Sequence, residues 1–423
     1  MRRRGGALVH TAGNLAPLVT GLVTAPLTAR ALGPDGRGEV VIIVLLSSAV
    51  ITIGSLGLGW VAREEIARDR LSLGYWRRLA RIASLIAILP TLAAAATIAL
   101  VLQLGPAEVA GTFALLLLAA FAASRSVDGN IMVSTGKIGT LGAANLSYAI
   151  FVVVGTVCLF AIGELSVATA LFVNAGGLAV QMTLLSIGIA HASRHTRSEI
   201  RSRQLELAES RSPREVIGMA SRAWRAQLLD TAATRADSIL VAIGAGAGGV
   251  GIYSIAGLIP QIAYALAATL TQRSFAVTPT LSAAARLRTL QQASVVVSLL
   301  FVAVSVPAAF FLIPTVFGDA FIESRGWLVP ASSVAVGLSA LAPLLVFQAR
   351  DRSCRGIVVV AHVLTPMAVS LALLPASPAL SILALGLGFF ASGLIGTFVA
   401  VGRGSLMFDS QSFLKIVGLG KLG

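Results

Sequence analysis

The sequence predicts an all-α, polytopic membrane protein in which about twelve transmembrane helices form two six-helix bundles, with both termini in the cytoplasm. Three observations predict this fold. Of the 423 residues, 56% are hydrophobic and only 12% are charged, and the mean hydropathy is +0.89. Apolar runs long enough to span a bilayer recur along the whole chain. Arginine and lysine collect in alternate connections between these runs.

The first half of the chain contains six candidate spans. They are Ala7–Ala29, Val40–Val61, Ile82–Leu104, Ala107–Ala123, Leu141–Ile162 and Leu165–Ile189. Three arginines precede the first run, but this run is longer than a signal-peptide core and is soon followed by another. We therefore expect it to remain as a helix, and we expect residues 1–189 to form an amino-terminal lobe.

The second half repeats this organisation after a polar stretch. Residues 190–215 have mixed charge and are predicted to form a cytoplasmic linker, either solvated or as a surface helix that touches anionic lipid. Residues 216–402 are predicted to form a second six-helix lobe, and residues 403–423 a cytoplasmic tail. The spans of this lobe are Ile217–Ala245, Val250–Thr271, Val295–Phe317, Trp327–Phe347, Ile357–Leu374 and Leu380–Val401.

The distribution of basic residues supports this count and sets the orientation. The outer connections hold only Arg30, Arg37 and Arg325, whereas every inner segment is basic, including a predicted inner loop with Arg125 and Lys137. A missed span would have inverted the later half of this alternation. The net charge of +14 is therefore assigned to orientation and to contact with membrane lipids, and nucleic acid is not an expected partner.

A weak internal echo also favours two related halves. The stretch LGPDGRGEVVIIV from Leu32 resembles IGAGAGGVGIYSI from Ile243, and each joins the first span of a half to its second. Such repeats are common in transporters. Chance similarity of small residues is the alternative.

The seventh span is unusual because it places charged residues in or near the membrane. At about 100° per residue, one face of this helix carries a polar stripe. The stripe consists of Arg222, Gln227, Asp230, Thr234 and Asp237, with Arg225 just beyond its edge. Because charge in the bilayer is costly, the stripe is predicted to face a watery cavity or a partner, not lipid, and we expect it to line a central cavity. The alternative is that the two arginines snorkel to the interface and Asp230 neutralises a neighbouring cation.

Other polar side chains within the spans extend the candidate site. Asn14 and Asn145 are predicted to contribute hydrogen bonds to a hydroxyl-rich ligand, although such amides often only join helices. Two cysteines and four scattered histidines offer no metal-ligand spacing. No motif for an enzyme nucleophile, a zinc hydrolase or a P-loop is present, so no enzyme activity, metal or cofactor is expected.

Two stretches resemble a known family. TAPLTARALGPDGRGEVVIIVLLSSAVITIGSLGLG, from Thr24, and RADSILVAIGAGAGGVGIYSIAGLIPQIAYALAATL, from Arg235, resemble the polysaccharide flippases of the multidrug/oligosaccharidyl-lipid/polysaccharide (MOP) exporter superfamily. The resemblance implies two six-helix bundles that form a V around a central cavity. It also implies transport of undecaprenyl-pyrophosphate-linked oligosaccharide across a bacterial plasma membrane by alternating access.

The resemblance assigns roles to residues of the seventh span. Arg222 and Arg225 are expected to meet the cargo head group, and Asp237 is expected to couple an ion, H+ or Na+, or to position the helix. The first span has no carboxylate, in contrast to the drug and cation antiporter branch, and it also lacks the arginine motif of the peptidoglycan-precursor flippases.

The sequence leaves three functions open. The leading one is the flippase, with a polysaccharide polymerase and glycosyltransferases as further expected partners. The second is a cation-coupled exporter of drugs or other small molecules. The third is a membrane scaffold of a polysaccharide synthesis complex that transports nothing.

Overall fold

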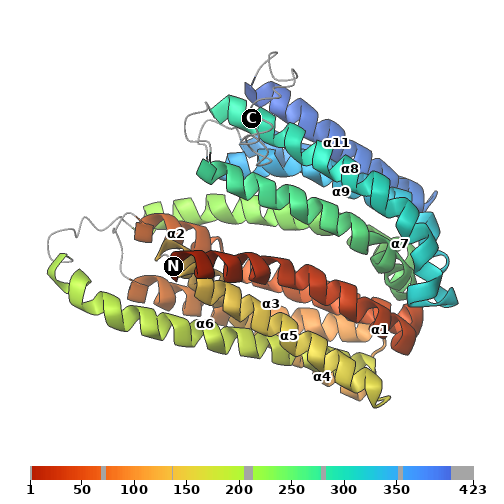
Figure 1. The fold of residues 1–423 in the computed structure, drawn as a ribbon, viewed down its shortest axis with the longest axis horizontal. Helices are drawn as coiled ribbons and strands as arrows, with labels where there is room; N and C mark the ends of the chain where they lie inside the picture. Colours follow the sequence, from red (N-terminus) through yellow and green to blue (C-terminus); the bar gives the residue numbers. More distant parts are fainter. Residues whose placement is uncertain are drawn as a thin grey trace. The chain divides into compact units, whose positions relative to one another are not determined.

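The computed structural model describes residues 2–67, 73–135, 137–203, 213–277, 283–350 and 356–401. In these ranges every regular element is helical (Figure 1). Residues 204–212 of the predicted linker and the whole tail, 403–423, lie outside the described residues. The helices of the first half are α1 (Arg2–Gly54), α2 (Leu58–Ala67), α3 (Leu73–Val101), α4 (Pro106–Ser134), α5 (Ile138–Ala161) and α6 (Val167–Arg203). Those of the second half are α7 (Pro213–Val277), α8 (Ala283–Phe317), the short η1 (Asp319–Phe321), α9 (Ser324–Arg350), α10 (Gly356–Leu373) and α11 (Pro378–Val401).

The predicted polytopic helical fold is confirmed. Within the described ranges, nine helical segments are long and apolar enough to cross a bilayer, and α10 adds a shorter apolar segment, Val360–Leu373. Two of the nine, in α1 and α7, fold back at a glycine and so supply two spans each. The chain is therefore a multi-pass membrane protein of about twelve spans, six in each half.

The two fold-back points are equivalent glycines. Gly33 has φ 66° and ψ −174°, and Gly246 has φ 66° and ψ −166°. Positive φ is costly for residues with a Cβ, so glycine is the residue that allows each helix to reverse here. The sequence echo aligned Leu32 with Ile243, whereas the matching backbone geometry pairs Gly33 with Gly246. The register of the echo was therefore wrong by two residues, because similar small residues surround both turns.

Contacts divide the chain into two compact units. The amino-terminal unit comprises Met1–Leu32 and Glu39–Leu228, and the carboxy-terminal unit comprises Gly33–Gly38 and Leu229–Gly423. The boundary thus lies inside α7, because its first turns pack with the first-half helices and the remainder packs with the second-half helices.

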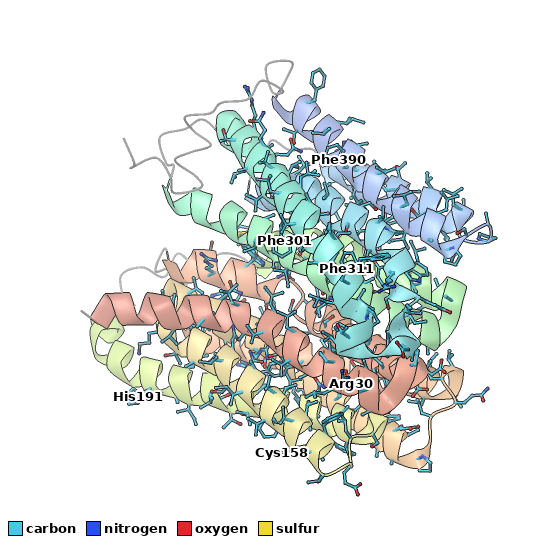
Figure 2. All side chains as sticks on the ribbon, turned by 45° about the vertical axis from the view of Figure 1, so that its right-hand side comes forward. Arg30, Cys158, His191, Phe301, Phe311 and Phe390 are labelled. Atoms are coloured by element: carbon cyan, nitrogen blue, oxygen red, sulfur yellow. The ribbon has the colours of Figure 1, made fainter. Side chains whose placement is uncertain are left out.

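In the amino-terminal unit, α4 packs against α2, α3 and α6, and α5 packs against α6 (Figure 1). Ile43, Leu116 and Leu171 form part of the core and are fully buried. The apolar side chains at the periphery are exposed, as expected for helices whose outer faces meet lipid. Cys158, labelled in Figure 2, is among the exposed side chains.

In the carboxy-terminal unit, α9 packs against α8 and α11, and α10 packs against α11 (Figure 1). Small residues allow α9 and α11 to approach closely. A Cβ added to Gly386 would overlap the backbone at Ser333, and one added to Gly393 would overlap the carbonyl group of Ala340. The segment Gly33–Gly38 crosses the Gly246 turn in the same way, because a Cβ on Gly38 would overlap the carbonyl oxygen of Ala247.

Candidate functional site

Helix α4 carries a cation where the sequence predicted a loop. The fourth span was predicted to end at Ala123, but α4 continues to Ser134, so Arg125 lies in a helix and not in a loop. Its assignment to the inner side stays a prediction. Arg125 lies nine residues before the end of α4, which is about 14 Å along the helix axis. The helix continues because the polar side chains of this stretch have partners on the neighbouring helices.

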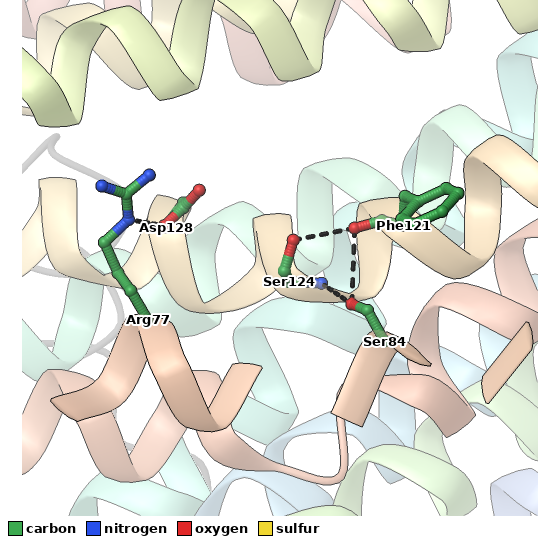
Figure 3. A network of polar contacts seen from close by, with 5 residues as sticks. All are labelled: Arg77, Ser84, Phe121, Ser124 and Asp128. Atoms are coloured by element: carbon green, nitrogen blue, oxygen red, sulfur yellow. Dashed lines mark hydrogen bonds and ion pairs between the residues drawn. The ribbon is translucent and has the colours of Figure 1, made fainter. Parts of the chain in front are cut away.

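On one side, α3 holds α4 at two levels (Figure 3). Ser84 of α3 accepts a hydrogen bond from the N–H of Ser124 at 3.1 Å and donates to the carbonyl oxygen of Phe121 at 3.5 Å. One turn further along α4, the carboxylate of Asp128 lies 3.6 Å from Nε of Arg77. These contacts fix the rotation of α4 about its axis and leave Asp128 with a counter-ion.

On the side of α4 that faces α6, Arg125 is hydrogen-bonded to an amide and not to a carboxylate. Its guanidinium donates a hydrogen bond to Oε1 of Gln181 on α6. The amide nitrogen of Gln181 then donates to Oδ1 of Asn145 on α5 at 2.6 Å. We call Arg125, Gln181 and Asn145 the arginine cluster. It joins three helices of the amino-terminal unit.

A second polar contact lies one turn from Asn145 on the same pair of helices. The hydroxyl of Tyr148 donates to Oδ1 of Asn174 at 3.2 Å, and the Asn174 amide donates to the carbonyl oxygen of Ala170 at 2.9 Å. The α5–α6 contact is therefore hydrogen-bonded at two successive levels. In the part of the chain that the structure describes, no carboxylate forms an ion pair with Arg125.

The stripe predicted on the seventh span is divided between the two units. Arg222, Arg225 and Gln227 belong to the amino-terminal unit, and Asp230 and Asp237 belong to the carboxy-terminal unit. Both arginines are exposed, and Nε of Arg225 is 3.3 Å from the carbonyl oxygen of Ser221 in its own helix. Gln227 accepts a hydrogen bond from Ser55 at 3.4 Å. Helical periodicity placed these residues on one face, but it could not show what each part of that face contacts.

The two aspartates of the carboxy-terminal unit differ in their surroundings. Asp230 is exposed, whereas Asp237 is 7% exposed. One carboxylate oxygen of Asp237 accepts a hydrogen bond from Tyr253 at 2.6 Å, and the other accepts from the N–H of Ser238 at 2.7 Å. Tyr253 also packs edge-on against Trp327, with ring centroids 5.5 Å apart. These contacts tie the two arms of α7 to α9, and the predicted roles of Asp237 in ion coupling or helix positioning both stay predictions.

Asn14 lies in α1, but its side chain is outside the described residues. Among the described side chains, no group of three or more histidine, cysteine, aspartate or glutamate residues could hold a metal ion.

Comparison with known proteins shows which fold this is. No family model matches the chain, and no curated protein matches its sequence. Among solved structures, it is similar to an inward-facing multidrug resistance MATE family transporter of the MOP superfamily, with a TM-score of 0.60 and 14% identity over 98% of this chain and 96% of that one. The chain has the MOP transporter fold.

Two further structures with this fold are similar over nearly their full length. One is a MOP superfamily transporter from Pyrococcus furiosus whose description reports a binding pocket of reversed polarity, with a TM-score of 0.60 and 13% identity over 99% of this chain and 96% of that one. The other is an outward-facing MATE transporter, with a TM-score of 0.56 and 15% identity over 99% and 96% of the two chains. At this identity the similarity establishes the fold alone.

Sequence reasoning missed that Arg125 and Asp128 lie within helix α4. It ended the fourth span where hydropathy falls, at the run Ser124–Asp128. A usable signal was nevertheless present. No proline follows Pro106 before the end of α4, and the helix stops only at Thr135, directly before Gly136.

Proposed function

We propose that this protein is a flippase of the bacterial plasma membrane that moves an anionic, lipid-linked oligosaccharide between leaflets by alternating access. Undecaprenyl-pyrophosphate-linked oligosaccharide is the proposed cargo class. The observation that carries the proposal is the arginine cluster, in which a partly buried cation of the amino-terminal unit is bonded to the amide of Gln181 and has no protein counter-ion among the described residues.

A cation among apolar helices is costly. Placing arginine at mid-membrane costs at least about 2.5 kcal/mol on insertion scales, and the cost falls when the side chain meets water or an anion. Gln181 accepts a hydrogen bond from the guanidinium without neutralising it, and Asn145 holds the Gln181 amide. A pyrophosphate would supply the missing charge, and guanidinium N–H groups match phosphate oxygens in geometry. Amide and hydroxyl groups nearby suit the hydroxyl-rich sugars of such a cargo.

The second candidate is a cation-coupled multidrug antiporter. Two of the structural neighbours are described as multidrug resistance MATE transporters, and this favours a related function for a chain of the same fold. The neighbour whose pocket has reversed polarity is described as suggesting a different function, so this fold accommodates pockets of more than one polarity. Arg125, which has no carboxylate partner among the described residues, opposes the entry of a cationic drug, and this is our reason to prefer the flippase.

The two transport functions predict different cargoes in one assay. Purified full-length protein is reconstituted into liposomes that contain a fluorescent undecaprenyl-pyrophosphate disaccharide, and dithionite added outside reports the fraction exposed in the outer leaflet. We expect the protein to accelerate exchange between leaflets. In parallel, ethidium efflux is measured under imposed proton and sodium gradients.

The outcomes separate all three readings of the sequence. Lipid exchange without gradient-driven ethidium efflux supports the flippase. Ethidium efflux without lipid exchange overturns it in favour of the antiporter. Neither activity, together with binding of polysaccharide polymerase or glycosyltransferases, supports the scaffold and also overturns the flippase.

A further inference from the structure

A proline leaves one carbonyl group of α8 without its usual helical partner. Helix α8 contains Pro307 and Pro314. Because proline has no backbone N–H, the carbonyl group four residues before it cannot form the hydrogen bond of a regular helix. For Pro314, this carbonyl group belongs to Phe310. An unpaired carbonyl in a membrane-spanning helix is costly, so we expect it to bind a donor from another element.

Arg325, the second residue of α9, supplies that donor. Its Nε donates a hydrogen bond to the carbonyl oxygen of Phe310 at 2.7 Å. The central carbon of the same guanidinium lies 4.5 Å from the centroid of the Phe310 ring, which adds a cation–π contact. Two contacts to one residue hold the guanidinium in place. Part of the entropy cost of ordering this long side chain is therefore met before any ligand binds.

The held guanidinium keeps most of its donors. Arginine has five N–H groups, so four remain after the Nε–H is used. Asp319 and Glu323 are exposed close by in the sequence, but among the described residues no carboxylate forms an ion pair with Arg325. The remaining N–H groups form a fork that matches two oxygens of a phosphate. Arg325 is therefore suited to bind a phosphate group.

An exposed apolar row on α8 begins beside this cation. The ring of Phe311 packs edge-on against Phe310, with centroids 5.7 Å apart, and Phe311 is labelled in Figure 2. Leu300, Val304 and Phe311 are 65%, 76% and 71% exposed. Their spacing of four and seven residues places them on one face of the helix. In a multi-pass membrane protein, such a face meets the hydrocarbon chains of lipids.

From these observations we propose that Arg325 binds the phosphate of an anionic phospholipid whose chain lies along the apolar row of α8. We call Arg325, Phe310, Phe311, Val304 and Leu300 the lipid site. All five residues belong to the carboxy-terminal unit. The distribution of arginines predicts that the site faces the outer leaflet. Phosphatidylglycerol fits better than phosphatidylcholine, because the choline group carries a positive charge that Arg325 repels. The inference does not depend on which cargo the protein carries.

The first test places a fluorescent reporter in the lipid site. Phe311→Trp is made in the full-length protein, and the four native tryptophans are replaced by Trp60→Phe, Trp76→Phe, Trp224→Phe and Trp327→Phe. The protein is reconstituted into bilayers that contain chain-brominated phosphatidylglycerol or phosphatidylcholine, because bromine quenches the fluorescence of a tryptophan that it contacts. One arginine near a membrane surface contributes about 1 kcal/mol to binding of anionic lipid, so phosphatidylglycerol should bind about 5-fold more tightly than phosphatidylcholine.

Two substitutions separate the charge from the way in which it is held. Arg325→Gln removes the charge and should abolish the preference for phosphatidylglycerol. Pro314→Ala retains the charge but gives Phe310 a helical N–H partner that competes with Arg325, so it should lower the preference by about 2-fold. The matched controls are Pro307→Ala in the same helix and Arg30→Gln, an exposed arginine that is also predicted on the outer side. Neither control should change the preference.

Several results would overturn the lipid site. Equal quenching by the two brominated lipids in the Phe311→Trp parent would show that no anionic lipid is selected. A loss in Arg30→Gln or Pro307→Ala as large as in Arg325→Gln or Pro314→Ala would assign the preference to general surface charge or to the shape of α8. Displacement of phosphatidylglycerol by an excess of glycerol 3-phosphate would indicate a site for a soluble phosphate instead.

A second measurement keeps all native tryptophans and so does not depend on the folding of the reporter protein. Native mass spectrometry counts the phosphatidylglycerol molecules that the otherwise unmodified full-length protein retains at increasing lipid concentration. Arg325→Gln should retain less phosphatidylglycerol than the parent, whereas Arg30→Gln should retain the same amount. Equal retention by the parent and Arg325→Gln would overturn the proposal.

Discussion

Replacing Arg125 with glutamine tests whether the arginine cluster recognises an anion. The change removes the positive charge from α4 and retains a polar amide at this position. In the structure, the guanidinium gives one hydrogen bond to Gln181, and arginine has five N–H donors in total, so several remain for a cargo phosphate. The effect on cargo affinity should therefore exceed the effect on folding.

The magnitude follows from the bond that is lost. A hydrogen bond to a charged group contributes about 1.5 to 3 kcal/mol, so Arg125→Gln should weaken the apparent affinity for the pyrophosphate-linked lipid by about 10- to 150-fold. Arg125→Lys keeps the charge and loses the forked geometry, so its loss should be smaller. The assay is the concentration dependence of lipid exchange in liposomes. Arg78→Gln, an exposed arginine at the start of α3, is the matched control.

Two results would refute this reasoning. Unchanged apparent affinity in Arg125→Gln would show that the cluster only joins α4, α5 and α6. A loss in thermal stability as large as the loss in affinity, with Arg125→Lys equally affected, would lead to the same conclusion. Ethidium efflux that appears only in Arg125→Gln would instead strengthen the argument, because removal of the cation would then have admitted a cationic compound.

Three further predictions concern the stability of the carboxy-terminal unit, measured as unfolding of the purified protein in detergent. Tyr253→Phe leaves one oxygen of buried Asp237 without its 2.6 Å donor and should lower the free energy of unfolding by about 1 to 3 kcal/mol. Asp237→Asn should lower it by less. Normal stability of Asp237→Asn combined with loss of ion-driven transport would contradict a positioning role. Gly251→Val places a side chain against the carbonyl oxygen of Pro34 and should cost about 1 to 3 kcal/mol, whereas Gly326→Ala, which has open space around the new methyl, should be neutral or stabilising. Equal effects of these two changes would refute the close crossing. Gln291→Met removes hydrogen bonds to the carbonyl oxygens of Ala340 and Gly393, at 2.9 and 2.6 Å, and should lower the free energy of unfolding by about 1 kcal/mol. An unchanged unfolding midpoint would show that these bonds do not stabilise the contact of α8 with α9 and α11.

The sequence predicted the architecture because the bilayer imposes it. A helix must be apolar over a length set by membrane thickness, so hydropathy alone located about twelve spans. The two glycine turns were also foreseeable in position, since short runs of small residues separate paired spans. The residue-by-residue alignment of the two turns could not be foreseen, because similar small residues occupy neighbouring positions around Gly33 and Gly246.

The ends of the spans were less predictable. Hydropathy stops α4 near Ala123, yet the helix continues past Arg125 and Asp128 because partners on α3 and α6 satisfy these polar groups. Those partners are distant in sequence, and Gln181 is 56 residues from Arg125. A scale that scores each residue separately assigns such a stretch to a loop.

The sequence alone therefore determined that this chain crosses the membrane many times, in two halves, and it predicted that the basic residues lie predominantly on one side. Only the tertiary structure decided which polar groups meet: Arg125 with Gln181 and Asn145, Asp237 with Tyr253, and the start of α7 with the α1–α2 turn. The physical reason is that solvent preference and helical period are local properties of a chain. Solvent preference fixes the environment of a residue, and helical period fixes the face of the helix on which it lies. The partner on that face depends on how separate helices pack, which is a property of the whole fold.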